Sequence, residues 1–138
     1  MNLCDQKDHL INNLEIPSGV TSIPDYAFMQ CSIIKEISLP NTLEEIGERA
    51  FEDCRIAKIT IPKSVRNIGK HAFYTNSLFT VISLMEEPPF YNNFLNAVFH
   101  DKTYKNGILY VPTGTLEKYK KYGWNNFLYI EEGAETME

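Results

Sequence analysis

Hydrophobic and polar positions follow one order in three consecutive stretches of the chain, Leu14 to Phe28, Ile37 to Phe51 and Ile59 to Phe73. Each stretch holds an aliphatic-polar-aliphatic triplet, a proline, two further aliphatic positions and a final Ala-Phe pair. The second stretch starts 23 residues after the first, and the third starts 22 residues after the second. The chain is therefore a repeat protein, whose units bury their apolar side chains only by stacking on one another.

The triplets predict short strands. In Ile37-Ser38-Leu39 the alternation has the period of a strand, so the aliphatic residues should face the core and Ser38 the solvent. The following proline ends the strand because it has no N–H to donate. Ile46-Gly47 then predicts a turn into a short helical segment that carries the Ala-Phe pair. In the first unit Pro24 occupies the slot of this glycine, where we expect a first helical position.

A period in the low twenties is typical of leucine-rich repeats. The spacing I-x-I-P-x-x-V-x-x-I-G-x-x-A-F-x-x-C resembles the BspA-like class of these repeats over roughly residues 8–130, with three full units and a partial one. The resemblance implies an α/β repeat fold, a leucine-rich-repeat solenoid with short parallel strands and a C-terminal helical cap. Because members occur mainly in bacterial surface proteins and in some parasitic protists, it also implies adhesion and a cell-surface or extracellular location.

The repeat register divides the chain into four parts. Residues 1–10 form an N-terminal lead-in, and residues 11–112 form the solenoid, with three regular units and one degenerate unit. Residues 113–130 form the C-terminal cap. Residues 131–138 are an acidic tail that we expect to be disordered.

The degenerate unit begins at Ile82-Ser83-Leu84, and we align Ile82 with Ile59 of the third unit. Phe94 and Phe99 are both candidates for its aromatic slot. After the turn signal Asn106-Gly107, a last strand-proline pattern runs from Ile108 to Pro112.

The cap is predicted from helical spacing of Leu116, Tyr119 and Tyr122. Thr113 or Thr115 serves as the N-cap, and Gly123 as the C-terminal stop. Three lysines form the polar outer face that a solenoid cap requires: Lys118, Lys120 and Lys121.

Outward residues of parallel strands line up across a solenoid, and such strips are the usual recognition surfaces of repeat proteins. With Ile82 in the register of Ile59, Val81 and Ser83 face outward. The candidate ligand strip consists of Glu15, Glu36, Ser38, Lys58, Thr60, Ser83 and Tyr110. The alternative is an ordinary solvated sheet face.

Charge and motifs exclude several functions. The net charge is −5 and the lysines are scattered, which argues against a nucleic-acid partner. No apolar stretch is long enough for a membrane span. The chain lacks G-x-S-x-G, P-loop, H-E-x-x-H and dinucleotide motifs, as well as zinc-type Cys and His spacings. We therefore predict no enzyme, no cofactor and no metal site, and we expect His9, His71 and His100 to be structural or solvated.

Cys31 and Cys54 share one repeat slot, whereas Cys4 lies outside the repeat pattern. A disulfide between them is one alternative, because neighbouring strands lie about 4.8 Å apart. Two reduced, buried thiols are the other, and we favour it because free cysteine is among the most buried residue types.

These features predict a noncatalytic module that binds a protein or peptide, with adhesion or recognition at a bacterial cell surface implied by the resemblance. The alternatives are a structural end-cap segment of a longer repeat protein and a small intracellular scaffold, since residues 1–7 have no signal-peptide pattern. Few apolar residues precede the first strand, Leu14 to Ile16, so its open edge predicts either self-association there or coverage by a preceding repeat of a longer protein.

Overall fold

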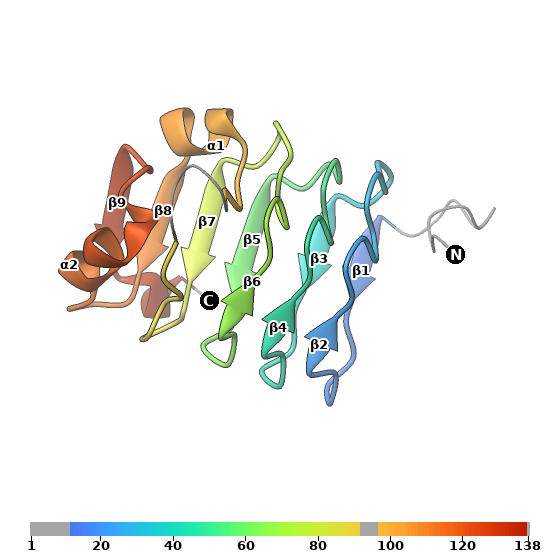
Figure 1. Cartoon of the computed structure of the whole chain (residues 1–138), viewed down its shortest axis with the longest axis horizontal. Coiled ribbons are helices and arrows are strands. Elements are labelled where there is room, and N and C mark those ends of the chain that lie inside the picture. Colours follow the sequence, from blue (N-terminus) through green and yellow to red (C-terminus); the bar gives the residue numbers. More distant parts are fainter. Residues whose placement is uncertain (1–11, 92–96, 138) are drawn as a thin grey trace.

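A computed structural model describes residues 12–91 and 97–137 of the chain. Its main strands follow one another along the long axis, from the N-terminal end to the opposite end (Figure 1). They are β1 (Asn13–Glu15), β3 (Glu36–Ser38), β5 (Lys58–Ile61), β7 (Thr80–Ser83), β8 (Ile108–Val111) and β9 (Tyr129–Glu132). β1 pairs with β3, and β5, β7, β8 and β9 form a second ladder. These pairings are parallel, so the predicted solenoid of short parallel strands is confirmed.

Another, narrow sheet runs along the other side of the coil, in the order β2-β4-β6. Its strands are β2 (Ser22–Ile23), β4 (Glu45–Ile46) and β6 (Asn67–Ile68). In the repeat slot that follows them, Gly47 N donates to Ile23 O and Gly69 N to Ile46 O, each at 2.8 Å. The sequence did not predict these strands because two residues are too few for a visible alternation.

The segments that carry the Ala-Phe pairs are turns, so the predicted short helices there are wrong. Tyr26, Arg49 and His71 precede the alanines and have positive φ values of 61°, 54° and 56°. Their turns donate backbone N–H groups to the next coil instead of along a helix, for example Tyr26 N to Glu48 O at 2.8 Å. Hydrogen bonding between coils therefore replaces the helical pattern.

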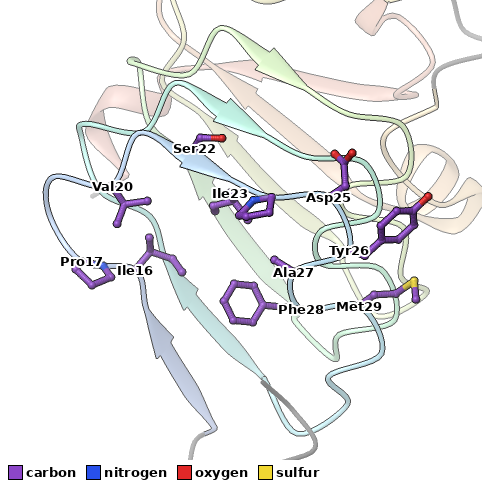
Figure 2. Close-up of a pocket in the computed structure, with 11 residues that line it drawn as sticks. Ile16, Pro17, Val20, Ser22, Ile23, Asp25, Tyr26, Ala27, Phe28 and Met29 are labelled. Atoms are coloured by element: carbon purple, nitrogen blue, oxygen red, sulfur yellow. The ribbon is translucent and has the colours of Figure 1, made fainter. Parts of the chain in front are cut away.

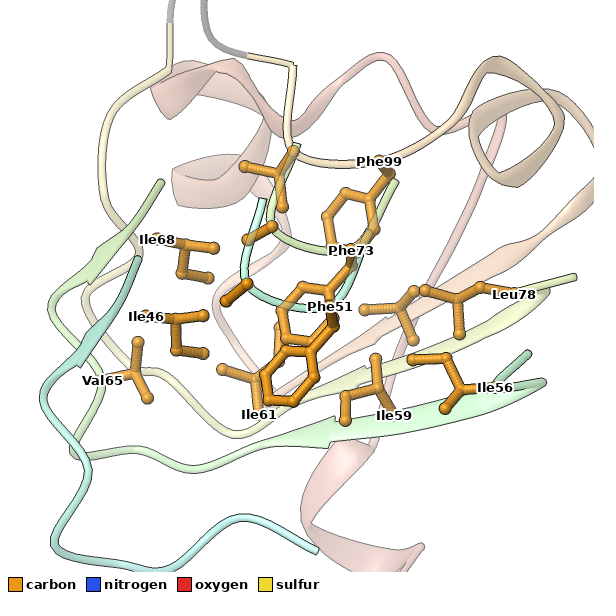
Figure 3. Close-up of a cluster of buried hydrophobic side chains, with 14 of the residues drawn as sticks. Ile46, Phe51, Ile56, Ile59, Ile61, Val65, Ile68, Phe73, Leu78 and Phe99 are labelled. Atoms are coloured by element: carbon orange, nitrogen blue, oxygen red, sulfur yellow. The ribbon is translucent and has the colours of Figure 1, made fainter. Parts of the chain in front are cut away.

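The core is a column of phenylalanine rings flanked by aliphatic side chains (Figure 3). Ring centroids are 5.4 Å apart for Phe28 and Phe51, 5.5 Å for Phe51 and Phe73, and 5.9 Å for Phe73 and Phe99. Phe99 thus fills the aromatic slot of the degenerate unit. The other candidate, Phe94, lies outside the described residues.

The C-terminal third of the chain contains the two α-helices that the structure describes, of which α2 belongs to the predicted cap. α2 (Leu116–Tyr119) continues as a π-helical segment, Lys120–Trp124, in which Gly123 has a φ of 96° and interrupts the helix as predicted. Thr115 occupies the N-cap position, as one of the two predicted candidates, but its hydroxyl donates to Pro112 O and makes no capping hydrogen bond to the helix. α1 (Asp101–Asn106) was not predicted; His100 Nδ1 caps it by accepting from Lys102 N at 3.0 Å.

The expectation of a disordered tail is wrong for residues 131–137. Glu131 and Glu132 belong to β9, which pairs with β8. A 3₁₀ helix, Ala134–Thr136, follows, and Ala134 is fully buried. The acidic composition misled the prediction because the carboxylates of Glu132 and Glu135 accept hydrogen bonds from Gly114 N and Thr113 N, which hold these residues on the chain.

Candidate functional site

The outward sheet face consists of two rows of side chains that cross the main strands. Strand register places them opposite one another within each ladder. The N-terminal half of this face comprises Asn13, Glu15, Glu36, Ser38, Lys58 and Thr60. The C-terminal half comprises Thr80, Ile82, Ile108, Tyr110, Tyr129 and Glu131.

The N-terminal half agrees with the predicted strip. Glu15, Glu36, Ser38 and Lys58 are exposed, and Thr60 is half-buried. None of the ion pairs within residues 12–91 and 97–137 involves Glu36 or Lys58, so both charges are available to a ligand. These five predicted residues lie on one continuous side of β1, β3 and β5.

Ser83 does not belong to the surface, and the register predicted for β7 is wrong by one residue. Val81 pairs with Ile59 and Ser83 with Ile61, so both point into the core. Ser83 is fully buried, and its Oγ lies 2.6 Å from the Tyr119 hydroxyl. A shift of one residue moves every side chain of a strand to its other face.

The C-terminal half is apolar and aromatic. Tyr110 is half-buried, as is Ile108 beside it on β8, and Tyr129 on β9 is 56% exposed. Tyr129 pairs with Ile108 in the parallel ladder. Sequence reasoning found Tyr110 but missed Tyr129, because β9 has no proline and follows no repeat pattern.

The last residues of the chain return to this face. We call residues 133–137 the C-terminal segment. In Figure 1 the chain passes from β9 back toward the lower ends of β5 and β7. Met137 lines a hollow of about 350 Å³ together with Ser38, Lys58, Thr60 and Leu84. The described C terminus thus forms one wall of a hollow on the candidate strip.

A larger hollow, of about 650 Å³, lies at the N-terminal end of the solenoid. Figure 2 shows Ile16, Val20, Ile23 and Phe28 of the first coil around it, with Asp25 and Tyr26 at one rim. Its lining is the apolar layer that the preceding coil covers elsewhere in the stack.

Cys31 and Cys54 are neither bridged to each other nor both reduced, so neither predicted alternative holds. Cys31 is disulfide-bonded, whereas Cys54 is a free, buried thiol, so the bridge between the two is absent and the prediction of a reduced thiol is wrong for Cys31. Burial raises the pKa of Cys54 to about 12, which keeps it protonated and unreactive at neutral pH. Cys4 lies outside the described residues.

The described histidines have structural partners. His100 caps α1, and its ring lies 4.8 Å from that of Tyr74, which also contacts the ring of His71 at 4.2 Å. Burial lowers the pKa of His71. His9 lies outside the described residues. Residues 12–91 and 97–137 contain no group of three or more metal-binding side chains, and no helix among them could cross a membrane.

Two crystal structures are similar to this chain at 22% sequence identity. A leucine rich cell surface protein from Faecalibacterium prausnitzii A2-165 matches with a TM-score of 0.56, over 88% of this chain and 38% of that one. A leucine-rich repeat protein from Bacteroides ovatus ATCC 8483 has a TM-score of 0.43, over 88% and 37%. This chain spans less than two fifths of either structure.

No curated protein matches the chain. The family model described as BspA type leucine rich repeat region (6 copies) matches residues 5–120. That range includes the three regular units and their proline, Ile-Gly and Ala-Phe slots. The chain belongs to the family of BspA-type leucine-rich repeat proteins.

Proposed function

We propose that the chain is a noncatalytic module that binds a protein or peptide through its outward sheet face, in adhesion or recognition at a bacterial cell surface. One observation carries this proposal: the outward side chains of six parallel strands form a strip that is charged at one end and aromatic at the other. Ordered strips of this kind are the recognition surfaces of repeat proteins.

The side chains of the strip favour a polypeptide ligand. Glu36 and Lys58 offer opposite charges on neighbouring strands, which can select and orient a partner. Tyr110 and Tyr129 combine an apolar ring with a hydroxyl, and tyrosine is enriched in protein interfaces. A partner that spans β3 to β9 would contact both kinds of surface.

Two observations support a location outside the cytoplasm. Cys31 is disulfide-bonded, and disulfides persist mainly in oxidising compartments. The structural relative from Faecalibacterium prausnitzii is named as a cell surface protein.

A charge swap tests the N-terminal half of the strip. Peptides selected on the wild-type chain from a random display library should bind the Glu36→Lys, Lys58→Glu double variant at least about tenfold more weakly. The swap keeps the net charge and reverses the charge order that the ligand meets. Fluorescence anisotropy measures the affinity. The free energy of unfolding, obtained from thermal denaturation, should change by no more than about 0.5 kcal/mol.

A matched swap on the other sheet is the control. Glu45→Lys with Lys70→Glu exchanges two exposed charges in and just after β4 and β6, away from the outward face. Binding should be unchanged in this variant. Equal losses in both variants, or no loss in the first, would contradict the proposed site.

The second candidate is a structural role, in which the chain joins a longer array or another copy through its N-terminal end. The apolar hollow of about 650 Å³ around Phe28 favours it. Within the described residues β1 pairs only with β3. Ile16 N donates to Ser38 O, so the alternating strand geometry directs the N–H of Glu15 away from β3.

Light scattering over a concentration series tests this role. If the edge of β1 pairs with another chain, the apparent mass should rise with concentration. Glu15→Pro should reduce the rise because it removes an N–H from the free edge and no bond to β3. A constant monomer mass for the wild-type chain would exclude self-association at this edge.

A further inference from the structure

The C-terminal segment is held at the end of β8 by a small set of specific contacts. Gly133 N donates to Val111 O at 2.9 Å, beside the β8–β9 ladder. The Glu135 carboxylate accepts from Thr113 N at 3.1 Å through one oxygen and from Thr113 Oγ1 at 2.6 Å through the other. The segment is thus bound as a peptide is bound, by one backbone contact and one recognised acidic side chain.

Two apolar side chains near these contacts are buried. Ile82 faces outward in register with Thr60 and Tyr110, yet it is only 1% exposed. Ala134 is fully buried, and both residues lie outside the main core. The helix that contains Ala134 packs against β8, and Met137 lines the hollow beside Thr60, so the C-terminal segment extends along both strands that flank Ile82.

Beyond Ala134 the fit is incomplete. Met137 stands at the hollow of about 350 Å³, whose other walls include Ser38, Lys58 and Thr60. A longer or differently placed apolar side chain could enter this space beside the Lys58 ammonium. The site therefore has room for a ligand that makes the contacts of the C-terminal segment and others in addition.

Release of the segment requires little free energy. Glu135 and Thr136 are exposed, and Ala134 is the fully buried side chain among residues 133–137. Segments with few buried contacts open locally at a small fraction of the global unfolding free energy. Release would uncover the side of β8 that this helix covers and leave the Phe28 to Phe99 column intact.

We propose that the C-terminal segment is a built-in, displaceable ligand of the outward sheet face. The partner that replaces it is a peptide of the same chemistry, a small residue followed by a glutamate and, two positions later, a methionine or leucine. This inference rests on the proposed function, because it uses the same face, and it adds the class of ligand and an intramolecular competitor that tunes its affinity.

A labelled copy of the segment is the probe. Fluorescein-labelled Glu-Gly-Ala-Glu-Thr-Met, the sequence of residues 132–137, is titrated with the full-length chain and followed by anisotropy. In the full-length Ala134→Arg variant the added side chain cannot remain in the buried position, so the site becomes vacant. The peptide should bind this variant at least about tenfold more tightly than the wild-type chain, in which the tethered segment competes.

Two controls define the contacts. Thr136→Arg adds the same charge at an exposed position of the segment, and it should bind the peptide as weakly as the wild type does. A peptide with glutamine in place of the residue corresponding to Glu135 should lose most of its affinity, because it cannot accept both Thr113 bonds as a carboxylate. Equal binding to the wild type and Ala134→Arg, or binding to neither, would overturn the inference.

A measurement on the wild-type chain covers the case in which Ala134→Arg does not fold. The methyl resonance of Met137 should move toward its random-coil position as unlabelled peptide is added to about millimolar concentration. No movement at that concentration would overturn the inference. If the peptide fails but the Glu36 and Lys58 swap still weakens selected peptides, the proposed function stands and only the built-in ligand is rejected.

Discussion

Replacement of Phe51 by alanine is expected to lower the free energy of unfolding by about 3–5 kcal/mol. The side chain is fully buried and stacks on Phe28 at 5.4 Å and on Phe73 at 5.5 Å. Truncation removes both ring contacts and leaves a cavity between two coils, which the hydrogen bonds between the coils prevent from collapsing. The lost packing therefore lies in the middle of the stack and weakens the contacts of both neighbouring coils.

Denaturant midpoints at constant slope give the change in stability. The matched control is Phe90→Ala, because Phe90 is 71% exposed and its ring centroid lies 6.4 Å from that of Tyr122 in a T-shaped arrangement. Its cost should stay within about 0.5 kcal/mol. Similar costs for the two variants would mean that the phenylalanine column does not stabilise the solenoid.

The regular units could be predicted from sequence because each apolar slot recurs. Phe28, Phe51 and Phe73 occupy one slot in three copies, and the structure places all three in one column. Recurrence cancels the ambiguity of a single apolar residue, since a slot that faces the core in one coil faces it in the next. The solenoid and its core therefore followed from the spacing alone.

Prediction failed where recurrence ends. In β7 the residues Val81 and Ile82 are both aliphatic, so alternation cannot tell which of them faces the core. The pairing of Val81 with Ile59 decides it, and Ser83 is buried as a result. The prediction for the C-terminal segment was wrong for another reason. Its ordered structure depends on tertiary contacts such as that of Glu135 with Thr113, and no local sequence pattern indicates such contacts.

The candidate strip was predicted in part for the same reason. Its N-terminal half lies on regular units, and Glu36, Ser38 and Lys58 are exposed as expected. Its C-terminal half depends on β9 and on the returning chain end, so Tyr129 and the burial of Ile82 could not be anticipated. The sequence thus identified the charged end of the strip and missed most of the aromatic end.

Gly47→Ala is expected to cost about 1–3 kcal/mol, the range for overpacking of a tight interior. A Cβ at this position would lie 2.5 Å from Asp25 N and 2.6 Å from the carbonyl carbon of Pro24, both backbone atoms of the preceding coil. Gly69 has the same relation to Gly47 and Glu48, with nearest distances of 2.5 to 2.7 Å. Backbone cannot move aside as a flexible side chain can, so the cost should approach the upper end of that range.

The first coil supplies the matched control in the same slot. Pro24 corresponds to Gly47, and it lines the open N-terminal hollow, where the described part of the chain places no coil against it. A side chain is therefore tolerated at position 24 because no described coil packs against it. This explains the proline more specifically than the helical start expected from the sequence. Pro24→Ala should change the unfolding free energy by no more than about 1 kcal/mol. Comparable losses for Pro24→Ala and Gly47→Ala in denaturant titrations would show that close approach of successive coils is not what selects glycine in this repeat.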